Sequence, residues 1–191
     1  MASLFVSRID TAIDKLLDEK IARANDPDEK ARLAALKGRI AIANAKLAYQ
    51  RYLRLFAGER WHALAAHGAK PQRLLWASTG TKNKTYSDVL YVEELTGPDT
   101  VNTMPVATLD AFRDRGKVRN TLQAETAEAQ RILGELGRVG ISIETVTDKL
   151  LHDGVQLFAD AADKLLGVVA NKRADLVGQI DKAGAGARSA A

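Results

Sequence analysis

The pattern of apolar and polar residues predicts three short strands, at Ser3–Val6, Leu74–Ser78 and Thr100–Met104. The second run is continuously apolar, which is typical of a parallel strand buried on both faces. Polar residues gather at its C-terminal end, where residues 79–84 combine a glycine, hydroxyl groups and two lysines. A loop of this composition is suited to hold an anion.

Helical periodicity accounts for the segments between and after these runs. In the second helix a heptad-like apolar stripe favours core packing, with a partner helix as the alternative. A strand, a helix and a second strand with polar strand ends form a βαβ unit. The predicted helices are Arg8–Arg23, 27–57 with Asp26 as N-cap and Pro27 at the first helical position, Glu59–His67, Asp88–Leu95 with Ser87 as N-cap, Ala107–Arg115, Thr121–Leu136, and Ile143 to about Val177.

Length and composition indicate one α/β domain with too few strands for a complete barrel. The chain has 191 residues, of which 46% are hydrophobic, enough for a sizeable core. A complete eight-stranded α/β barrel typically needs about 250 residues. We therefore predict a domain at residues 1–178 with about three parallel strands and many helices. The glycine-rich residues 179–191 are predicted to be a flexible tail.

Charge and residue usage exclude several classes of function. The chain contains no cysteine, which rules out disulfides and thiolate chemistry and fits a reducing compartment. Its net charge of +4 comes from 28 basic and 24 acidic residues that are interspersed, so no nucleic-acid partner is expected. No apolar run approaches the roughly 18 residues of a membrane span, and a cytoplasmic location is expected. The three histidines are scattered singly, so we expect no metal site.

Several stretches of the chain resemble the transaldolase family, in its longer variety that is sometimes fused to glucose-6-phosphate isomerase. Trp76–Asn83 (WASTGTKN) and Tyr91–Pro105 are similar to the last two strands of the family's barrel. The remaining matches cover most of the chain: Ser3–Asp10 with the sixth strand, Gly38–Lys46 and Tyr49 with a helical insertion, and Gly154, Val155 and Phe158 with the C-terminal helix.

This resemblance implies units six to eight of a TIM (β/α)8-type barrel. It also implies transfer of a dihydroxyacetone unit between sugar phosphates in the pentose phosphate pathway, through a lysine Schiff base and without a metal or an organic cofactor. The family's Schiff-base lysine lies on the fourth strand and has no counterpart here, so the chain alone is expected to be inactive. We expect a truncated reading frame, with an N-terminal half that complements the chain, or self-association through the open sheet edge.

By the same resemblance, the candidate substrate-binding residues are Ser3, Phe5, Arg8, Ser78 and Lys82, and none is catalytic. Ser3 and Phe5 correspond to pocket residues of strand six, and Ser78 to a hydroxyl of strand seven. Arg8 corresponds to the arginine that binds the substrate phosphate, for which a guanidinium is suited because it forms bidentate hydrogen bonds. Lys82 corresponds to a second basic phosphate ligand.

Simpler roles stay open for each candidate. Arg8 is also compatible with a surface arginine at a helix start, Ser78 with a capping or buried hydroxyl, and Lys82 with a solvated ammonium. At the level of the whole chain, the alternative function is a non-enzymatic helical interaction protein derived from a truncated barrel. A basic RNA-associated protein is a third reading, which the interleaved charges and few aromatic residues do not favour.

Overall fold

A computed structural model describes the backbone of residues 1–189 and the side chains of residues 1–178. The chain divides into two compact units, Met1–Thr147 and Asp148–Ala191. The first unit contains one three-stranded parallel sheet in the order β1-β2-β3. The strands are β1 (Ala2–Phe5), β2 (Leu74–Ala77) and β3 (Thr100–Thr103). The predicted α/β class with three parallel strands is therefore confirmed.

The register of the sheet places the strand residues on two faces. Ser3 pairs with Leu75 and Phe5 with Ala77, and these two positions of β2 pair with Val101 and Thr103 of β3. Because side chains alternate along a strand, these residues share one face of the sheet. All three strands run parallel, so their carboxyl ends lie at one edge of the sheet.

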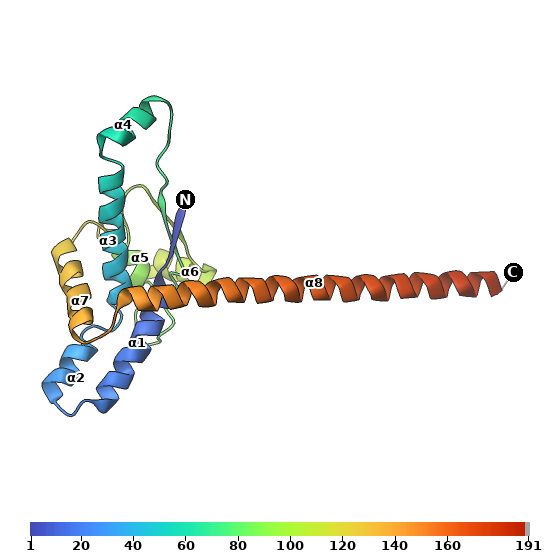
Figure 1. Cartoon of the computed structure of the whole chain (residues 1–191), viewed down its shortest axis with the longest axis horizontal. Coiled ribbons are helices and arrows are strands. Elements are labelled where there is room, and N and C mark those ends of the chain that lie inside the picture. The colour runs from blue at the N-terminus through green and yellow to red at the C-terminus, as the bar shows by residue number, and fades with distance from the viewer. Residues whose placement is uncertain (190–191) are drawn as a thin grey trace. The chain divides into compact units, whose positions relative to one another are not determined.

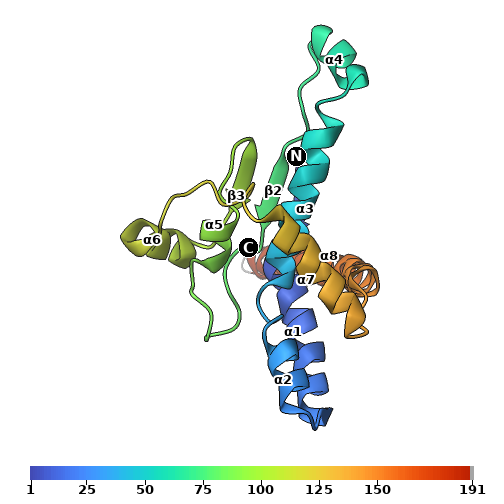
Figure 2. The same ribbon diagram turned by 90° about the vertical axis from the view of Figure 1, so that its left-hand side faces the viewer.

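Eight helices are assigned within residues 1–189, seven of them in the first unit. In Figures 1 and 2, α1 and α2 lie side by side, while α4 lies at the far end of α3. Their bounds are α1 (Val6–Arg23), α2 (Pro27–Ala34), α3 (Ile40–Leu55), α4 (Glu59–Ala66), α5 (Leu90–Glu94), α6 (Val106–Arg115), α7 (Thr126–Arg138) and α8 (Ile143–Ser189).

The core of the first unit forms where α1, α3 and α7 bury their apolar faces. Helix α3 packs against both α1 and α7. In α1 the buried apolar residues Val6, Ile9, Ile13 and Leu17 lie at intervals of three and four, as one apolar helix face requires. The fully buried large side chains include Ile13, Leu17, Leu33, Ile40, Tyr49, Trp76, Tyr91, Leu95, Leu122 and Leu136.

The single long helix predicted over residues 27–57 is wrong. Its start is confirmed, with the Asp26 carboxylate accepting a hydrogen bond from the Asp28 backbone N–H and Pro27 at the first position. Between α2 and α3, however, Gly38 adopts a left-handed backbone conformation with φ of +69°, which ends the helix. The apolar stripe spans this break, and Leu33, Leu36, Ile40 and Ala43 are all buried, as core packing requires.

Other helix limits also differ from the predictions. Helix α5 is shorter than predicted, although the Ser87 hydroxyl does accept a hydrogen bond from the Val89 backbone N–H at 3.4 Å. Helix α8 runs past Val177 to Ser189, through Gly154 and Gly167. Residues 190–191, the end of the predicted tail, lie outside the described residues, and the boundary at residue 178 stays a prediction. No helix in the described chain is long and apolar enough to span a membrane.

Candidate functional site

The carboxyl ends of β1 and β2 are joined through two serines. The Ser7 hydroxyl lies 3.0 Å from the Ser78 hydroxyl, and the Ser7 backbone N–H donates a hydrogen bond to the Ser78 carbonyl oxygen. Ser7 is buried in the first turn of α1, directly after β1, whereas Ser78 follows β2 and is partly exposed. The pair therefore brings the start of α1 and the end of β2 together at one place.

Ser78 holds an unusual backbone conformation. Its φ is +58°, in the left-handed region that residues other than glycine rarely adopt. Such strain persists only where the surroundings hold it, and it is common at ligand-binding positions. Here the bonds from Ser7 to both the hydroxyl and the carbonyl of Ser78 fix the conformation.

Arg8 lies next to this junction with its guanidinium exposed. The guanidinium carbon is 4.6 Å from the centre of the Phe5 ring, a cation–π contact that orients the side chain. No acidic residue lies in the first turn of α1, and no side chain caps its N-terminus. The partial positive charge of a helix N-terminus and a guanidinium together favour an anion at this position.

The end of β3 meets the loop after β2. Thr79 is fully buried, and its hydroxyl donates a 2.7 Å hydrogen bond to the side-chain oxygen of Asn102. The Thr103 hydroxyl donates to the Trp76 carbonyl oxygen of the neighbouring strand at 3.4 Å. These contacts hold the two strand ends together and use the proton of each hydroxyl, so neither hydroxyl is left to donate to an anion.

Lys82 lies on a different side of this loop. It lines an open cavity of about 540 Å³ beside α1, together with four carboxylates of that helix, Asp10, Asp14, Asp18 and Glu19. Within residues 1–178 no hydrogen bond or ion pair joins Lys82 to Arg8 or Ser78. The carboxylates disfavour the binding of an anionic ligand in this cavity, because like charges repel.

Two buried aspartates of α1 tie the neighbouring segments to this helix. The carboxylate of Asp10 accepts hydrogen bonds from the Ala41 backbone N–H at 2.8 Å and from the Tyr91 hydroxyl at 2.8 Å. The carboxylate of Asp14 accepts from the Gly38 backbone N–H at 3.1 Å and from the Tyr86 hydroxyl at 2.6 Å. The start of α3 and the segment from residue 86 to residue 91 are thereby fixed against α1.

Burial changes the acidity of this network. Desolvation raises the pKa of the Asp10 carboxyl from 3.8 to about 6, although its hydrogen bonds to Ala41 and Tyr91 act in the opposite direction. Desolvation and the neighbouring carboxylates also raise the pKa of Tyr86 and of Tyr91. Both phenols therefore stay protonated near neutral pH and serve as hydrogen-bond donors. No cluster of three or more possible metal ligands occurs in the part of the chain that the structure describes.

A family model described as Transaldolase/Fructose-6-phosphate aldolase matches residues 1–169. The chain belongs to this family. Membership agrees with the three parallel strands and with the family resemblance inferred from the sequence.

Relatives in the transaldolase family give the same result. The transaldolase of Trichodesmium erythraeum is 46% identical over 174 residues, which cover 90% of this chain and 46% of the relative. Transaldolase 2 of a Nostoc species is 47% identical over 175 residues, covering 90% of this chain and 46% of the relative. The Frankia alni transaldolase is 47% identical over 173 residues, which cover 90% of this chain and 44% of the relative. The chain thus spans less than half the length of these relatives.

The structure brings some of the predicted site residues together and not others. Phe5 and Arg8 are in contact, and Ser78 is hydrogen-bonded to Ser7, which precedes Arg8 in sequence, whereas Lys82 lines the acidic cavity. Ser3 is exposed on the same face of β1 as Phe5. The binding roles of all five residues remain predictions.

Sequence reasoning missed the residues that support this junction. Ser7 was not singled out, although a hydroxyl beside Arg8 at a strand end was a usable signal. Asp10 and Asp14 were also missed, and their position four residues apart beside the apolar stripe of α1 would have revealed them. The left-handed conformation of Ser78 had no signal in the sequence, because serine does not ordinarily favour it.

Proposed function

We propose that this chain supplies the phosphate-binding end of a transaldolase active site. The observation that carries the proposal is the junction where Ser7, in the first turn of α1 and next to Arg8 in sequence, meets the strained Ser78. A phosphate there would receive bidentate hydrogen bonds from the guanidinium and a further one from the Ser78 hydroxyl. Ser3 and Phe5 would line the adjoining pocket for the sugar.

The proposed reaction is transfer of a dihydroxyacetone unit between sugar phosphates through a lysine Schiff base, in the pentose phosphate pathway. Its support is family membership together with relatives that carry the name transaldolase. Such a reaction needs a lysine with a lowered pKa, and burial in an apolar site provides this. No further group is needed from a metal or an organic cofactor.

We infer that the Schiff-base lysine comes from outside these 191 residues. None of the strands β1, β2 and β3 contains a lysine. The lysine that is buried among residues 1–178 is Lys46, and its ammonium forms an ion pair with Glu94 at 3.2 Å. This ion pair engages the Lys46 ammonium on α3, outside the sheet, so Lys46 is not placed to attack a carbonyl at the strand ends. The chain alone is therefore proposed to be inactive.

The sheet itself suggests how the site would be completed. In the described chain β1 and β3 are both edge strands, each with an unpaired row of backbone groups. An N-terminal half that carries the first five βα units would pair with these edges and close the barrel. This would bring the strand-four lysine to the carboxyl ends of the strands, where barrel enzymes hold their active sites.

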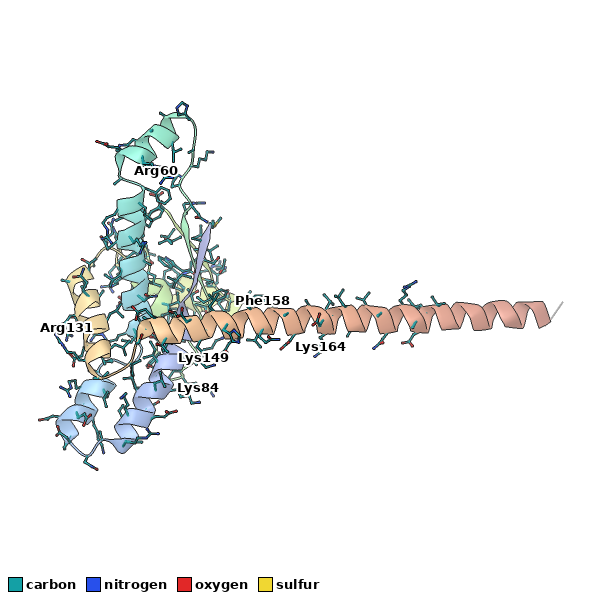
Figure 3. All side chains as sticks on the ribbon, viewed as in Figure 1. Arg60, Lys84, Arg131, Lys149, Phe158 and Lys164 are labelled. Atoms are coloured by element: carbon teal, nitrogen blue, oxygen red, sulfur yellow. The ribbon has the colours of Figure 1, made fainter. Side chains whose placement is uncertain are left out.

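Phosphate binding is the direct test on the chain as it exists. We expect inorganic phosphate and fructose 6-phosphate to shift the amide resonances of residues 6–8 and 78–80 in an NMR titration. Arg8→Gln should weaken binding by about ten- to a hundredfold, the effect of losing a charge-assisted hydrogen bond. Arg60→Gln is the matched control, because Arg60 is an exposed arginine on α4 (Figure 3). Equal binding by the Arg8→Gln variant and the parent would contradict the site.

Reconstitution tests the reaction. The chain would be assayed for coupled transaldolase activity alone and after coexpression with the part of the Trichodesmium erythraeum relative that lies outside the alignment. We expect activity, and an imine trapped by borohydride with fructose 6-phosphate, only in the mixture. Activity of the chain alone would overturn the placement of the lysine, and a folded complex without activity would argue against the proposed reaction.

The second candidate is a non-enzymatic helical interaction protein. It is favoured by the second unit, where the large apolar side chains of α8 from Leu151 to Val177 are exposed to solvent. A chain of this kind would bind neither phosphate nor fructose 6-phosphate at Arg8, so the NMR titration separates the two candidates.

A further inference from the structure

The Ser7 hydroxyl is buried, and its burial limits the hydrogen bonds that it can make. Ser7 is 1% exposed, and its side-chain oxygen lies 3.0 Å from that of Ser78. Within the side chains that the structure describes, Ser78 is the one hydrogen-bond partner of this hydroxyl. The Thr11 hydroxyl, one turn further along α1, donates instead to the Ser7 carbonyl oxygen at 2.8 Å. The Ser7 proton therefore has Ser78 as its available acceptor.

Burial also decides which of the two serines donates. The distance alone is compatible with either direction, because a hydroxyl group can both donate and accept. If Ser78 donated, the Ser7 proton would be left in the interior without an acceptor, and an unsatisfied buried donor is costly. If Ser7 donates, its proton is satisfied and the remaining proton belongs to Ser78, which is partly exposed. The direction from Ser7 to Ser78 is therefore the stable one.

Ser7 holds the backbone of Ser78 as well. The Ser7 backbone N–H lies in the first turn of α1, where the helix offers it no partner, and it donates to the Ser78 carbonyl oxygen at 3.0 Å. Ser78 keeps its left-handed φ of +58° under this constraint. A side chain that is already fixed loses less conformational entropy when a ligand binds to it.

The other hydroxyls at the strand ends direct their protons into the protein. Thr79 donates to a side-chain oxygen of β3, and Thr103 donates to a carbonyl oxygen of β2. With Ser7 donating to Ser78, its proton is also used within the first unit. Among these hydroxyls, it is that of Ser78 that keeps a proton for a ligand.

We propose that Ser7 is a positioning residue for the phosphate site, whose buried hydroxyl donates to Ser78 and so directs the Ser78 proton toward the ligand. Ser7 itself would not touch the ligand. This inference rests on the proposed function, because it takes the ligand to be a phosphate bound by Arg8 and Ser78. It does not rest on anything outside the chain, since the burial of Ser7 and both of its bonds to Ser78 lie within the first unit.

The direction of this hydrogen bond sets which ligand group fits. The Arg8 guanidinium carries only donors, and Ser78 would also face the ligand as a donor. Both groups therefore require acceptors, which an ionised phosphate provides on each of its free oxygens. Because the Ser78 oxygen accepts from Ser7 while its proton is donated, the two hydrogen bonds polarise and strengthen each other.

Binding of fructose 6-phosphate to the full chain, measured by NMR titration, tests the role of Ser7. Ser7→Ala should raise the dissociation constant by about three- to tenfold, the effect of losing a neutral hydrogen bond. Ser7→Cys should weaken binding to a similar extent, because a thiol fills the space but is a weak donor. Thr11→Val is the matched control, since it removes a neighbouring hydroxyl of α1 that does not contact Ser78, and it should leave binding unchanged. Binding by Ser7→Ala equal to that of the parent, or full rescue by Ser7→Cys, would overturn the proposal.

A double-mutant cycle separates positioning from general support of the fold. Ser78→Ala should weaken binding by about ten- to a hundredfold, since it removes a donor to a charged ligand. Adding Ser7→Ala to this variant should weaken binding no further, because Ser7 acts through the Ser78 hydroxyl. A residue that merely supported the fold would weaken binding equally in both backgrounds, and that result would refute the positioning role.

The parent chain offers a measurement that needs no substitution. The hydroxyl proton of Ser7 should exchange slowly with water and lie close to the Ser78 side chain in NMR spectra, because it is buried and hydrogen-bonded. Fast exchange of this proton would contradict the proposed direction of the hydrogen bond.

The Arg8→Gln variant distinguishes failure of this inference from failure of the phosphate site. If Arg8→Gln loses binding while Ser7→Ala does not, the site stands and the role of Ser7 is wrong. If the parent chain binds no phosphate, both are wrong. Weakened binding by Arg8→Gln and Ser7→Ala, with no effect of Ser7→Ala in the Ser78→Ala background, is the result that we expect.

Discussion

At the residue scale, the two buried carboxylates of α1 explain how the first unit holds its shape around the candidate site. Asp10 and Asp14 each accept one backbone N–H from the segment at residues 38–41 and one tyrosine hydroxyl. These bonds compensate for burial, since an unpaired buried carboxylate is costly. The compensation is incomplete for Asp10, whose pKa is raised to about 6.

This raised pKa makes stability depend on pH. The native state holds the Asp10 proton up to about pH 6, whereas the unfolded chain loses it near pH 3.8. The free energy of unfolding should therefore fall as pH rises through this window, by about 3 kcal/mol for this group. The Asp10→Asn variant keeps an oxygen that can accept the Ala41 backbone N–H. In this variant the pH-dependent contribution of Asp10 should be absent from the free energy of unfolding, measured with urea between pH 4 and 7.

Asp110→Asn serves as the control for this prediction. Asp110 is an exposed carboxyl on α6, and its loss should leave the pH dependence of the parent chain unchanged. The half-buried Glu128, whose pKa the Arg131 guanidinium lowers to about 2, affects stability in a separate pH range. Its stabilising contribution is lost as pH falls from 4.5 to about 2. If the free energy of unfolding of Asp10→Asn depended on pH as steeply as that of the parent, the assignment of this pH dependence to Asp10 would be refuted.

Gly38 is a residue whose identity the fold requires. Its φ of +69° disfavours any side chain, and a Cβ would lie 2.7 Å from the Tyr86 ring. Gly38→Ala should lower the free energy of unfolding by at least about 1 kcal/mol. Gly134→Ala should instead stabilise by about 0.5–1 kcal/mol, because Gly134 lies inside α7 with open space around it. Urea unfolding of both variants measures this, and a neutral Gly38→Ala would contradict the account.

At the scale of elements, the segment between β2 and α5 depends on its attachment to α1. The Tyr86 hydroxyl donates to Asp14, and its ring covers Gly38, so one side chain joins the loop to both α1 and the start of α3. Loops carry high conformational entropy unless such contacts hold them. The position of the residues from Ser78 to Lys82 therefore depends on a contact several residues away.

Tyr86→Phe should destabilise the first unit by about 1.5–3 kcal/mol, because the Asp14 carboxylate loses the hydrogen bond that the Tyr86 hydroxyl donates to it. Tyr52→Phe is the matched control. Tyr52 is also buried and packs against Tyr49 and Phe56, but its hydroxyl has no hydrogen-bond partner within residues 1–178. Its loss should change stability by less than about 0.5 kcal/mol. Thermal and urea unfolding compare the two variants. Equal losses of stability would rule out the Tyr86–Asp14 hydrogen bond as the contact that attaches the loop to α1.

At the scale of the whole molecule, the two units derive their stability from different sources. The first unit has a core of packed helices and a sheet, whereas the second is a single helix with no core of its own. An isolated helix is only marginally stable in water, and Gly154 and Gly167 weaken it further. Its stability must then come largely from contacts beyond the helix itself.

Hydrogen exchange would reveal this difference. In dilute solution, amides of residues 150–176 should exchange at least about tenfold faster than the buried amides of α3. Protection of α8 as high as that of α3 would contradict this account.

Part of the candidate site followed from residue type and order. The polar ends of apolar runs located Ser78, and the resemblance pointed to Phe5 and Arg8, which the structure brings into contact. The separation of Lys82 from them did not follow, because the direction of a loop after a strand depends on what it packs against. The same holds for Asp10 and Asp14, whose partners lie 24 to 81 residues away in sequence.

By itself the sequence determined the three strands, most of the helices, the α/β class and the family, because periodicity and local motifs are written along the chain. It did not determine the break at Gly38, the left-handed Ser78 or the network around Asp10. Those were decided by tertiary structure, since each depends on side chains that meet only after the chain folds.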